Sequence, residues 1–498
     1  MRSLELLVVG AALCACGFPR PDRVGPGNGD GGVDVPLPPG QLVSFGFSTT
    51  QNTGLVHDLH GAFSPDRGTI HSIGFQLDRT AMTPMFATSD PGDVVEVGGE
   101  VQLSARNAHD FTGPVLYQVT STTGDVNRYA VTVESRGLPQ PTTIQRNQIS
   151  DLAVADVDGD GKPDIVLAGT DAGDLEVYLD TTDPGSPTPG FALPSGVLSG
   201  LTPSRVVLAD LNGDGKPEMI AGESGTTLSI VVNTTTQPGQ VAFAAGRPQP
   251  MFGTDVQAIA AGDLNGDGKL DLATSDTSQN LVHEALNQTT VDDPTMIAFS
   301  AVSTTASGAL PADLALADCD GDGVLDTVVA DQNEAQVQVI LGATQSSDTM
   351  PYFGSRRSAA LQGPYRLAIT DLDHDGDPDV LVTTKSKPLV AVLTNDGHGQ
   401  MGVATPATTY PTVAVAVLDL DGDGFMDFVV ASTNSSNGGA VEAFINPANG
   451  TTIFHDQTSV SLTSEPIAAA VGDFNGDGIE DLVIATSSGF SVYLMGGP

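Results

Sequence analysis

The chain has no tryptophan, and among its 498 residues there are only three cysteines and 19 basic residues. Against 61 acidic residues, these few Lys and Arg leave a formal net charge of −42. Nucleic acids and anionic membrane surfaces are bound by neutralising phosphates with Lys and Arg, so the composition argues against both partners. Cys14 and Cys16 lie at the end of an N-terminal apolar segment. Cys319 then has no partner except Cys16, and an internal disulfide framework is excluded.

Charged residues are also scarce, at 16%, whereas Gly and Pro are abundant, with 58 and 33 copies. This combination indicates many short strands and tight turns rather than long helices. With 40% hydrophobic residues the chain can bury a substantial core, and its length suggests two or three domains.

The longest apolar run near the N-terminus covers residues 6–15 and is too short to span a bilayer as a helix. Its length suits the hydrophobic region of a secretory signal peptide. The run ends in Cys14-Ala15-Cys16, which resembles the bacterial lipobox. The resemblance implies that residues 1–15 are a lipoprotein signal peptide and that Cys16 carries the lipid; an ordinary signal peptide is the alternative. In the lipoprotein family, a residue other than Asp directly after the cysteine, here Gly17, is typical of proteins sent to the outer membrane. The resemblance therefore implies anchoring to the bacterial envelope, at the outer membrane or cell surface.

Two further segments precede the repeats described below. Residues 16–40 are rich in Gly, Pro and Asp and show no apolar period, which predicts a tether without a core. Residues 41–136 contain short runs of alternating apolar and polar residues separated by turn residues, which predicts a small β-sandwich. The expected strands include 42–47, 69–75, 115–119 and 129–133. The last two, with Gly124 between them, resemble an immunoglobulin-like module of bacterial surface proteins, usually a spacer or adhesive unit.

The rest of the chain repeats one acidic loop seven times, with first residues separated by 54, 53, 55, 53, 48 and 54 residues. A period near 50 residues is typical of a propeller or a solenoid. Each copy has an oxygen-bearing side chain at positions 1, 3, 5 and 9. The seven sets are Asp156, Asp158, Asp160 and Asp164; Asp210, Asn212, Asp214 and Glu218; Asp263, Asn265, Asp267 and Asp271; Asp318, Asp320, Asp322 and Asp326; Asp371, Asp373, Asp375 and Asp379; Asp419, Asp421, Asp423 and Asp427; and Asp473, Asn475, Asp477 and Asp481.

Alternating hard oxygens suit Ca²⁺, which takes six to eight such ligands, and crowded carboxylates repel one another unless a cation lies among them. Position 6 is always Gly, as a sharp reversal around an ion requires. Position 7 varies freely, which fits a ligand supplied by the backbone carbonyl. These residues are Lys162, Lys216, Lys269, Val324, Asp377, Phe425 and Ile479. We therefore predict about seven Ca²⁺ ions.

An EF-hand needs a Glu at position 12 and flanking helices, but here position 12 is Leu, Ala, Thr, Val or Ile and the flanks have strand character. The loop resembles instead the calcium loop of the FG-GAP or VCBS repeat, the blade unit of the integrin α-subunit propeller. The resemblance covers residues 140–498 and implies an all-β, seven-bladed propeller. Each blade would have four strands, with the loop joining strand one to strand two. The lack of tryptophan argues against a WD40-type blade. The chain ends after the last strand three, so we expect a strand near Thr142–Gln148 to close the ring.

The sequence leaves three kinds of function open. The leading hypothesis is a calcium-binding, non-catalytic cell-surface module for adhesion that binds an extracellular protein or a glycan. The alternatives are a polysaccharide lyase or hydrolase on a propeller scaffold and a passive envelope scaffold. No catalytic residues can be assigned from a motif. The expected binding face is opposite the calcium loops, where Phe252, Tyr365 and Tyr410 either stack on a glycan or pack between blades.

Overall fold

The computed structural model describes residues 9–10, 40–48, 50–52, 55, 59–60, 62–64, 69–75, 77–136, 138–169, 175–192, 194–198, 203–223, 228–290, 296–406, 408–434, 438–446 and 454–495. Within these ranges the chain forms strands and one short 3-10 turn, η1 (Pro250–Phe252), which confirms the all-β fold expected from the composition. Over the same ranges, no helix has the length and apolar character needed to cross a membrane. Cys16 and the tether, apart from Gly40, lie outside the described residues.

The N-terminal part is built from two sheets that pack against each other. One sheet has the order β3-β2-β6 and the other β4-β5-β10-β9-β7-β8. Their strands are β2 (Leu42–Phe47), β3 (Leu59–His60), β4 (Ala62–Ser64), β5 (Thr69–Phe75), β6 (Pro84–Thr88), β7 (Val94–Val97), β8 (Glu100–Val101), β9 (Val115–Thr120) and β10 (Val126–Arg136). Phe45, Phe47, Phe111 and Tyr117 form the buried aromatic centre between the sheets. The four strands expected in this segment are all present, and β5 pairs with β10 in parallel.

Seven antiparallel sheets follow in the described part of the chain, six with four strands and one with a fifth, β1 (Val9–Gly10), and we call the seven sets of four strands blades 1 to 7. Their strands are β12 (Ile149–Ala155), β13 (Asp164–Gly169), β14 (Leu175–Tyr178) and β15 (Ser195–Leu198); β16 (Pro203–Ala209), β17 (Glu218–Glu223), β18 (Leu228–Val231) and β19 (Arg247–Gln249); β20 (Val256–Gly262), β21 (Asp271–Asp276), β22 (Leu281–Ala285) and β23 (Ser303–Ala306); β24 (Pro311–Ala317), β25 (Asp326–Asp331), β26 (Gln336–Gly342) and β27 (Phe353–Ala360); β28 (Pro364–Thr370), β29 (Asp379–Thr384), β30 (Val390–Asn395) and β31 (Met401–Ala404); β32 (Thr412–Leu418), β33 (Asp427–Thr433), β34 (Gly439–Ile445) and β35 (His455–Leu462); and β36 (Pro466–Gly472), β37 (Asp481–Thr486), β38 (Gly489–Tyr493) and β11 (Thr142–Gln145).

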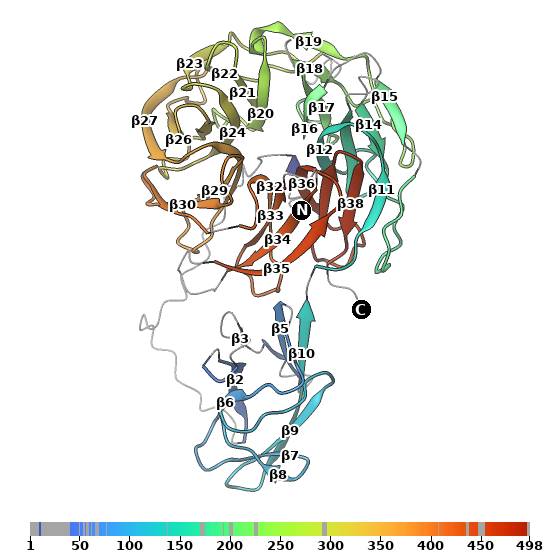
Figure 1. Ribbon diagram of the computed structural model, residues 1–498, viewed down its shortest axis with the longest axis vertical. Coiled ribbons are helices and arrows are strands. Elements are labelled where there is room, and N and C mark those ends of the chain that lie inside the picture. The colour runs from blue at the N-terminus through green and yellow to red at the C-terminus, as the bar shows by residue number, and fades with distance from the viewer. Residues whose placement is uncertain are drawn as a thin grey trace.

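The blades are arranged in a ring (Figure 1). The first strand of each blade contacts the first strand of the next, and β36 of blade 7 contacts β12 of blade 1. Neighbouring blades bury Val, Leu, Ile and Ala side chains against each other, and Phe428 and Phe444 add stacked rings between blades 5 and 6. The hydrophobic runs of the sequence therefore form the interfaces between blades. A two-residue strand, β1 (Val9–Gly10), pairs with β12.

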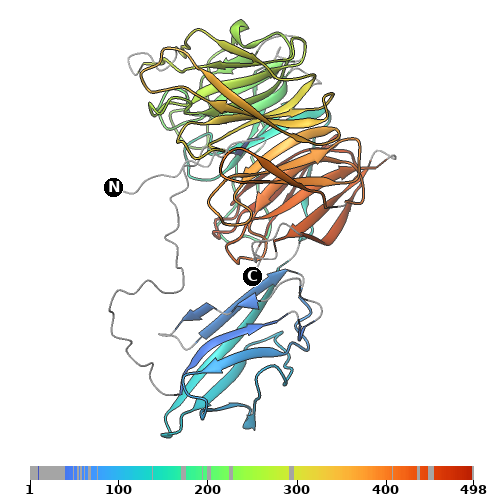
Figure 2. The same ribbon diagram turned by 90° about the vertical axis from the view of Figure 1, so that its left-hand side faces the viewer.

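The ring is closed by a strand from upstream of the first repeat. β11 pairs antiparallel with β38, with Thr142 opposite Val492 and Gln145 opposite Gly489. This confirms the closing strand expected near 142–148. The sandwich leads into the ring through β10 and then β11 (Figure 2). This pairing gives blade 7 its fourth strand. Without it, the backbone of β38 would be exposed at the edge of the sheet, where it could pair with other chains.

Candidate metal centres

Each acidic loop connects the first and second strands of its blade, so all seven lie on one face of the ring, which we call the loop face. In the first loop the Asp156 carboxylate accepts the backbone N–H groups of Gly159 and Gly161, at 2.7 and 2.8 Å. Asp158 accepts the N–H of Asp160 at 3.0 Å, and Asp160 accepts the N–H of Lys162 at 2.9 Å. The side chains at odd positions thus hold the backbone in a tight coil with their carboxylates turned towards its centre.

The coil depends on two residues with positive φ. Gly161 at position 6 has φ +89°, and Gly159 at position 4 has φ +80°. A side chain at such a position is strained, so glycine is favoured. The fifth loop departs from this pattern, because its position 4 is His374, which adopts φ +59°. Its ring stacks on Phe425 of the sixth loop with a centroid separation of 4.0 Å, which links two neighbouring loops.

The carboxylate at position 9 begins the second strand and is the most deeply placed. Asp164 accepts the N–H of Val157 at 2.9 Å and that of Asp180 at 2.8 Å, and it is 1% exposed. Burial, opposed by these hydrogen bonds and reinforced by the charges of Asp158 and Asp156, raises the pKa of Asp164 to about 8. Burial likewise raises the pKa of Glu218 to about 8 and that of Asp271 to about 7. A nearby cation would favour the ionised form of these groups.

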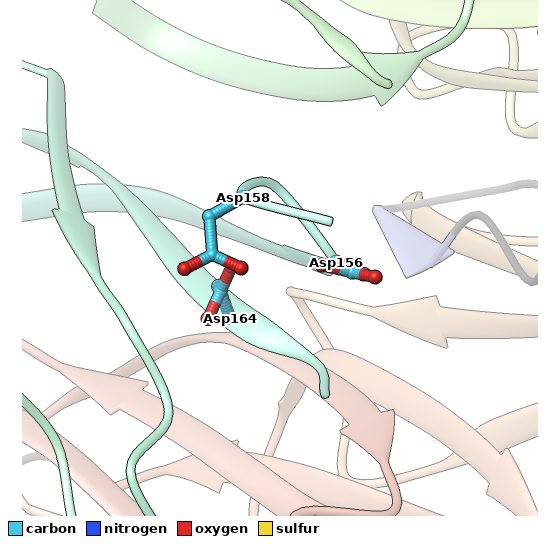
Figure 3. Close-up of side chains that lie close together, drawn as sticks. All are labelled: Asp156, Asp158 and Asp164. Atoms are coloured by element: carbon cyan, nitrogen blue, oxygen red, sulfur yellow. The ribbon is translucent and has the colours of Figure 1, made fainter. Parts of the chain in front are cut away.

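Four loops bring three carboxylates together, from positions 1, 3 and 9, with ligand oxygens within 4.8 Å of one another. Figure 3 shows this arrangement for Asp156, Asp158 and Asp164. The other three groups are Asp318, Asp320 and Asp326; Asp371, Asp373 and Asp379; and Asp419, Asp421 and Asp427. The remaining loops have Asn at position 3. The position 5 carboxylates and the position 7 carbonyls do not belong to these groups, so their assignment as ligands stays a prediction.

The residues at these loops fit a calcium ion. Asp320 and Asp371 each have one buried carboxylate oxygen without a hydrogen-bond partner, and both belong to the three-carboxylate groups. An unpaired buried carboxylate oxygen is costly unless a cation or donor reaches it. The donor set is all oxygen, which suits Ca²⁺, and a flexible loop accommodates its variable coordination better than the strict octahedron of Mg²⁺. Bound there, the ion would neutralise the crowded carboxylates and fix the loop.

Cys319 occupies position 2 of the fourth loop. It is fully buried, and its N–H donates to Asp326 at 2.8 Å. Burial raises the pKa of the Cys319 thiol, which favours its protonated form.

Sequence reasoning missed a set of residues that connect the loops of neighbouring blades. An Asn follows or ends the third strand in blades 2, 3, 5 and 6, and its side chain reaches the preceding loop. These residues are Asn233, Asn287, Asn395 and Asn446. Their recurrence at a similar place after four of the seven acidic loops was the signal available in the sequence.

The face opposite the loops carries the turns between second and third strands. Of the aromatics expected to stack on a glycan there, Phe252 is fully buried and packs edge-on against Phe299, so it serves the core instead. Tyr365 and Tyr410 are half-buried. The Tyr365 ring has the Lys385 ammonium 4.6 Å from its centroid, and Lys385 is exposed.

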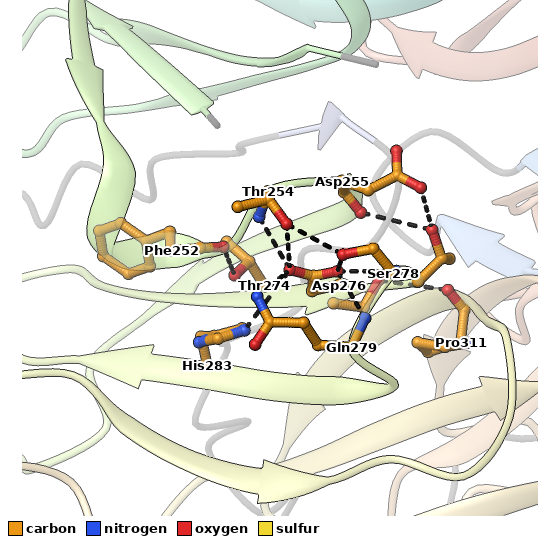
Figure 4. Close-up of polar contacts among 11 residues, drawn as sticks. Phe252, Thr254, Asp255, Thr274, Asp276, Ser278, Gln279, His283 and Pro311 are labelled. Carbon is orange, nitrogen blue, oxygen red and sulfur yellow. Dashed lines mark hydrogen bonds and ion pairs between the residues drawn. The ribbon is translucent and has the colours of Figure 1, made fainter. Parts of the chain in front are cut away.

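In blade 3, the carboxylate of Asp276 connects several segments of this opposite face through hydrogen bonds (Figure 4). Asp276 accepts the N–H groups of Thr254 and Ser278, both at 2.8 Å, and its side chain is buried. His283 lies beside it, with Nε2 4.0 Å from an Asp276 oxygen. The network fixes the turn after β21 against the loop that enters β20.

Comparison with known proteins identifies a family and solved structures that are similar to this chain. The FG-GAP-like repeat family matches residues 156–221, 210–274, 263–329, 318–382, 371–430 and 419–484, so each match runs from one acidic loop into the next. Among curated proteins, none is significantly similar in sequence to this chain. A crystal structure of BBS1N in complex with ARL6DN, soaked with lead, is similar to 71% of this chain and 94% of its own, at 15% identity and a TM-score of 0.45.

Proposed function

Because the chain belongs to the FG-GAP-like repeat family, we propose that it is a calcium-binding, non-catalytic module of the bacterial cell surface, anchored by a lipid on Cys16. In this proposal the propeller binds an extracellular protein or glycan. The repeated three-carboxylate group at the start of blades 1, 4, 5 and 6 is the observation that carries the calcium assignment. The seven ions hold the loops and thereby keep the blades in register.

The ligand is proposed to bind the face opposite the loops. The acidic side chains of the loop face accept hydrogen bonds from their own backbone, as Asp156 and Asp160 do, and they are the proposed calcium ligands, so they are not proposed to contact the external ligand. The opposite face presents turns with exposed side chains, such as Asn333 and Glu334, and it places half-buried Tyr365 beside exposed Lys385. An aromatic ring next to a cation suits a protein or sugar surface of either neutral or acidic character.

Binding is tested by applying the calcium-loaded protein to glycan and protein arrays. The expected result is retention on a defined subset of ligands that is reduced by Tyr365→Ala or Lys385→Ala. Asn333→Ala, on a neighbouring blade, maps how far the site extends. Retention that survives every opposite-face substitution contradicts this placement, no retention on any array supports a passive scaffold, and cleavage of an array glycan supports a polysaccharide-active enzyme instead.

The anchor is tested independently by expression in a bacterial host with metabolic acyl labelling. Cys16→Ser is expected to abolish labelling and to release the protein into the soluble fraction. Cys14→Ser, two residues away, is the matched control and should remain labelled and membrane-bound. A Cys16→Ser protein that stays in the membrane fraction contradicts the lipid anchor and leaves the calcium assignment untouched.

A further inference from the structure

Four buried asparagines bridge neighbouring blades at the loop face. The side-chain Nδ2 of Asn233 donates to the carbonyl oxygen of Val157 at 2.8 Å, across the boundary between blades 1 and 2. The other three bonds are Asn287 to Leu211 at 2.7 Å, Asn395 to Cys319 at 2.8 Å and Asn446 to Leu372 at 2.7 Å. In every case the acceptor is position 2 of the preceding acidic loop, which lies between the proposed ligands at positions 1 and 3.

The same asparagines are bonded to the acidic loop of their own blade. The backbone N–H of Asn287 donates to Asp271 at 2.6 Å, and Asp271 is the position 9 carboxylate of the third loop. On the other side of the bridge, the N–H of Leu211 donates to Glu218, position 9 of the second loop, at 2.8 Å. A continuous path therefore runs from Glu218 through the Leu211 peptide and Asn287 to Asp271. The position 9 carboxylates of two neighbouring loops are joined by one side chain.

The bridges are missing at three boundaries. At the equivalent place blade 4 has Gly342, blade 7 has Met495 and blade 1 has Asp180. Their backbone N–H groups still bind position 9 of their own loops, at 2.7, 2.7 and 2.8 Å. Gly342 has no side chain, Met495 has no donor, and the Asp180 carboxylate is itself an acceptor, bound by Thr182. Only the link to the preceding loop is lost.

Other contacts also join neighbouring blades, both where an asparagine bridge is present and where it is absent, as in the bond from the Thr327 hydroxyl of blade 4 to Glu284 of blade 3. The N–H of Gly239 in blade 2 donates to Asp158 of the first loop at 2.6 Å, and the N–H of Gly399 in blade 5 donates to Cys319 of the fourth loop at 2.9 Å. The stacking of His374 on Phe425 joins the fifth and sixth loops. Across the boundary between blades 7 and 1, Gly185 N–H contacts the Asn475 carbonyl through backbone alone. The loops joined by asparagine bridges form two runs, loops 1 to 3 and loops 4 to 6, with loop 7 outside both.

We propose that Asn233, Asn287, Asn395 and Asn446 are positioning residues that couple calcium binding within two groups of three loops, loops 1 to 3 and loops 4 to 6. This inference rests on the proposed calcium function. An ion that orders one loop fixes its position 2 peptide and its position 9 carboxylate. Through the bridging Asn it thereby orders the next loop before that loop binds. The second ion then pays less of the ordering cost, which is positive cooperativity without a change of fold.

Loop 3 provides an internal comparison, because Asn287 links it to loop 2 and no Asn links it to loop 4. Asp263→Asn removes one carboxylate ligand of loop 3 and keeps one oxygen acceptor, for the N–H of either Gly266 or Gly268, which donate to different oxygens of Asp263. Calcium is titrated into the metal-free full chain, and hydrogen exchange followed by mass spectrometry reports the midpoint of each loop separately. Loop 2 is expected to need about fivefold or more calcium than in the unsubstituted chain, a typical lower value for coupled sites, while loop 4 is unchanged.

A second variant tests whether the effect on loop 2 depends on Asn287. In the Asn287→Leu background, where the side chain keeps its size but loses its donor, Asp263→Asn should no longer shift loop 2. Equal shifts of loops 2 and 4, or no shift of either, overturn the coupling even if Asn287→Leu folds poorly, because that result needs only the Asp263→Asn chain. A chain that takes up no calcium in any loop instead overturns the proposed function, so the two failures are distinguishable.

Discussion

The hydroxyl oxygens of Thr143 and Ser491 are 2.8 Å apart although 348 residues separate them in the chain. Thr143 lies in β11 and Ser491 in β38, so this contact lies within the sheet that closes the ring. Closing a ring with strands from both ends of the repeat region makes the last blade depend on the residues before the first one. A substitution that weakens this pairing should therefore destabilise the closure of the whole ring and not only the structure of one local turn.

Gly489 is the residue at which this closure is most sensitive. A Cβ atom added there would lie 2.2 Å from the carbonyl oxygen of Ile144, a backbone atom that cannot move without breaking the β11 pairing. Gly489→Ala is expected to destabilise the protein by about 1–3 kcal/mol, the usual cost of forcing an atom into a packed region, as measured by urea unfolding. Gly113→Ala is the control, since a Cβ at Gly113 meets nothing within 4 Å. Equal stability of the two variants would contradict the tight closure.

Removal of calcium is expected to lower the melting temperature strongly. Each independent site held at a hundred times its dissociation constant stabilises the native state by about 2.7 kcal/mol, and several sites act together here. The measurement is thermal unfolding with and without a chelator, followed by addition of Ca²⁺ or Mg²⁺ in excess. Ca²⁺ should restore the melting temperature, whereas the same concentration of Mg²⁺ should restore less, because Mg²⁺ dehydrates reluctantly and needs a stricter geometry. An unchanged melting temperature in the chelator would contradict the calcium assignment.

Two substitutions in blade 4 distinguish the contribution of an acidic loop from that of the opposite face. Asp322, at position 5 of the fourth loop, accepts the N–H of Val324 at 2.8 Å and is one of the ligands predicted from sequence. Asp322→Ala is expected to reduce the calcium stoichiometry by one and to lower the melting temperature of the calcium-loaded protein. Asn333→Ala lies on the opposite face, where Asn333 is exposed, and should change neither. Isothermal titration calorimetry gives the stoichiometry, and an unchanged value for Asp322→Ala removes position 5 from the ligand set.

The sequence predicted those features that are local. An acidic loop is coiled by hydrogen bonds between residues at most seven positions apart, such as Gly161 to Asp156 and Val157 to Asp164, so its pattern can be recognised directly in the sequence. The closing strand was also predictable, because the last repeat lacks its own fourth strand. The bridges were not, since Asn233 and Val157 are 76 residues apart and meet only when two blades pack. The burial of Phe252 against Phe299 likewise depends on packing that no local pattern encodes.

Two aspartates at the same place in neighbouring blades are expected to respond to pH with opposite signs. Asp276 and Asp331 end β21 and β25, and both are fully buried. Burial alone would raise the pKa of Asp276, but hydrogen bonds from Ser278 and Thr254 lower it overall. For Asp331, burial, followed by the charge of Glu334, outweighs the opposing effects of Arg356 and Gln338 and raises its pKa to about 8.

For Asp331 the folded protein holds a proton that the unfolded chain releases near its ordinary pKa of 3.8. The stability contributed by the protonated group is fully present below that value and is lost as pH rises towards about 8. Asp331→Asn, which keeps the shape without the titration, should therefore stabilise the protein at pH 8 relative to pH 4 by about 1.4 kcal/mol or more, the free energy that corresponds to one pKa unit. Asp276→Asn should do the reverse, since its lowered pKa stabilises the folded protein above the ordinary value and Asn loses that gain. Urea unfolding at constant calcium from pH 4 to 8 measures both, and parallel curves for the two variants would contradict the difference in their surroundings.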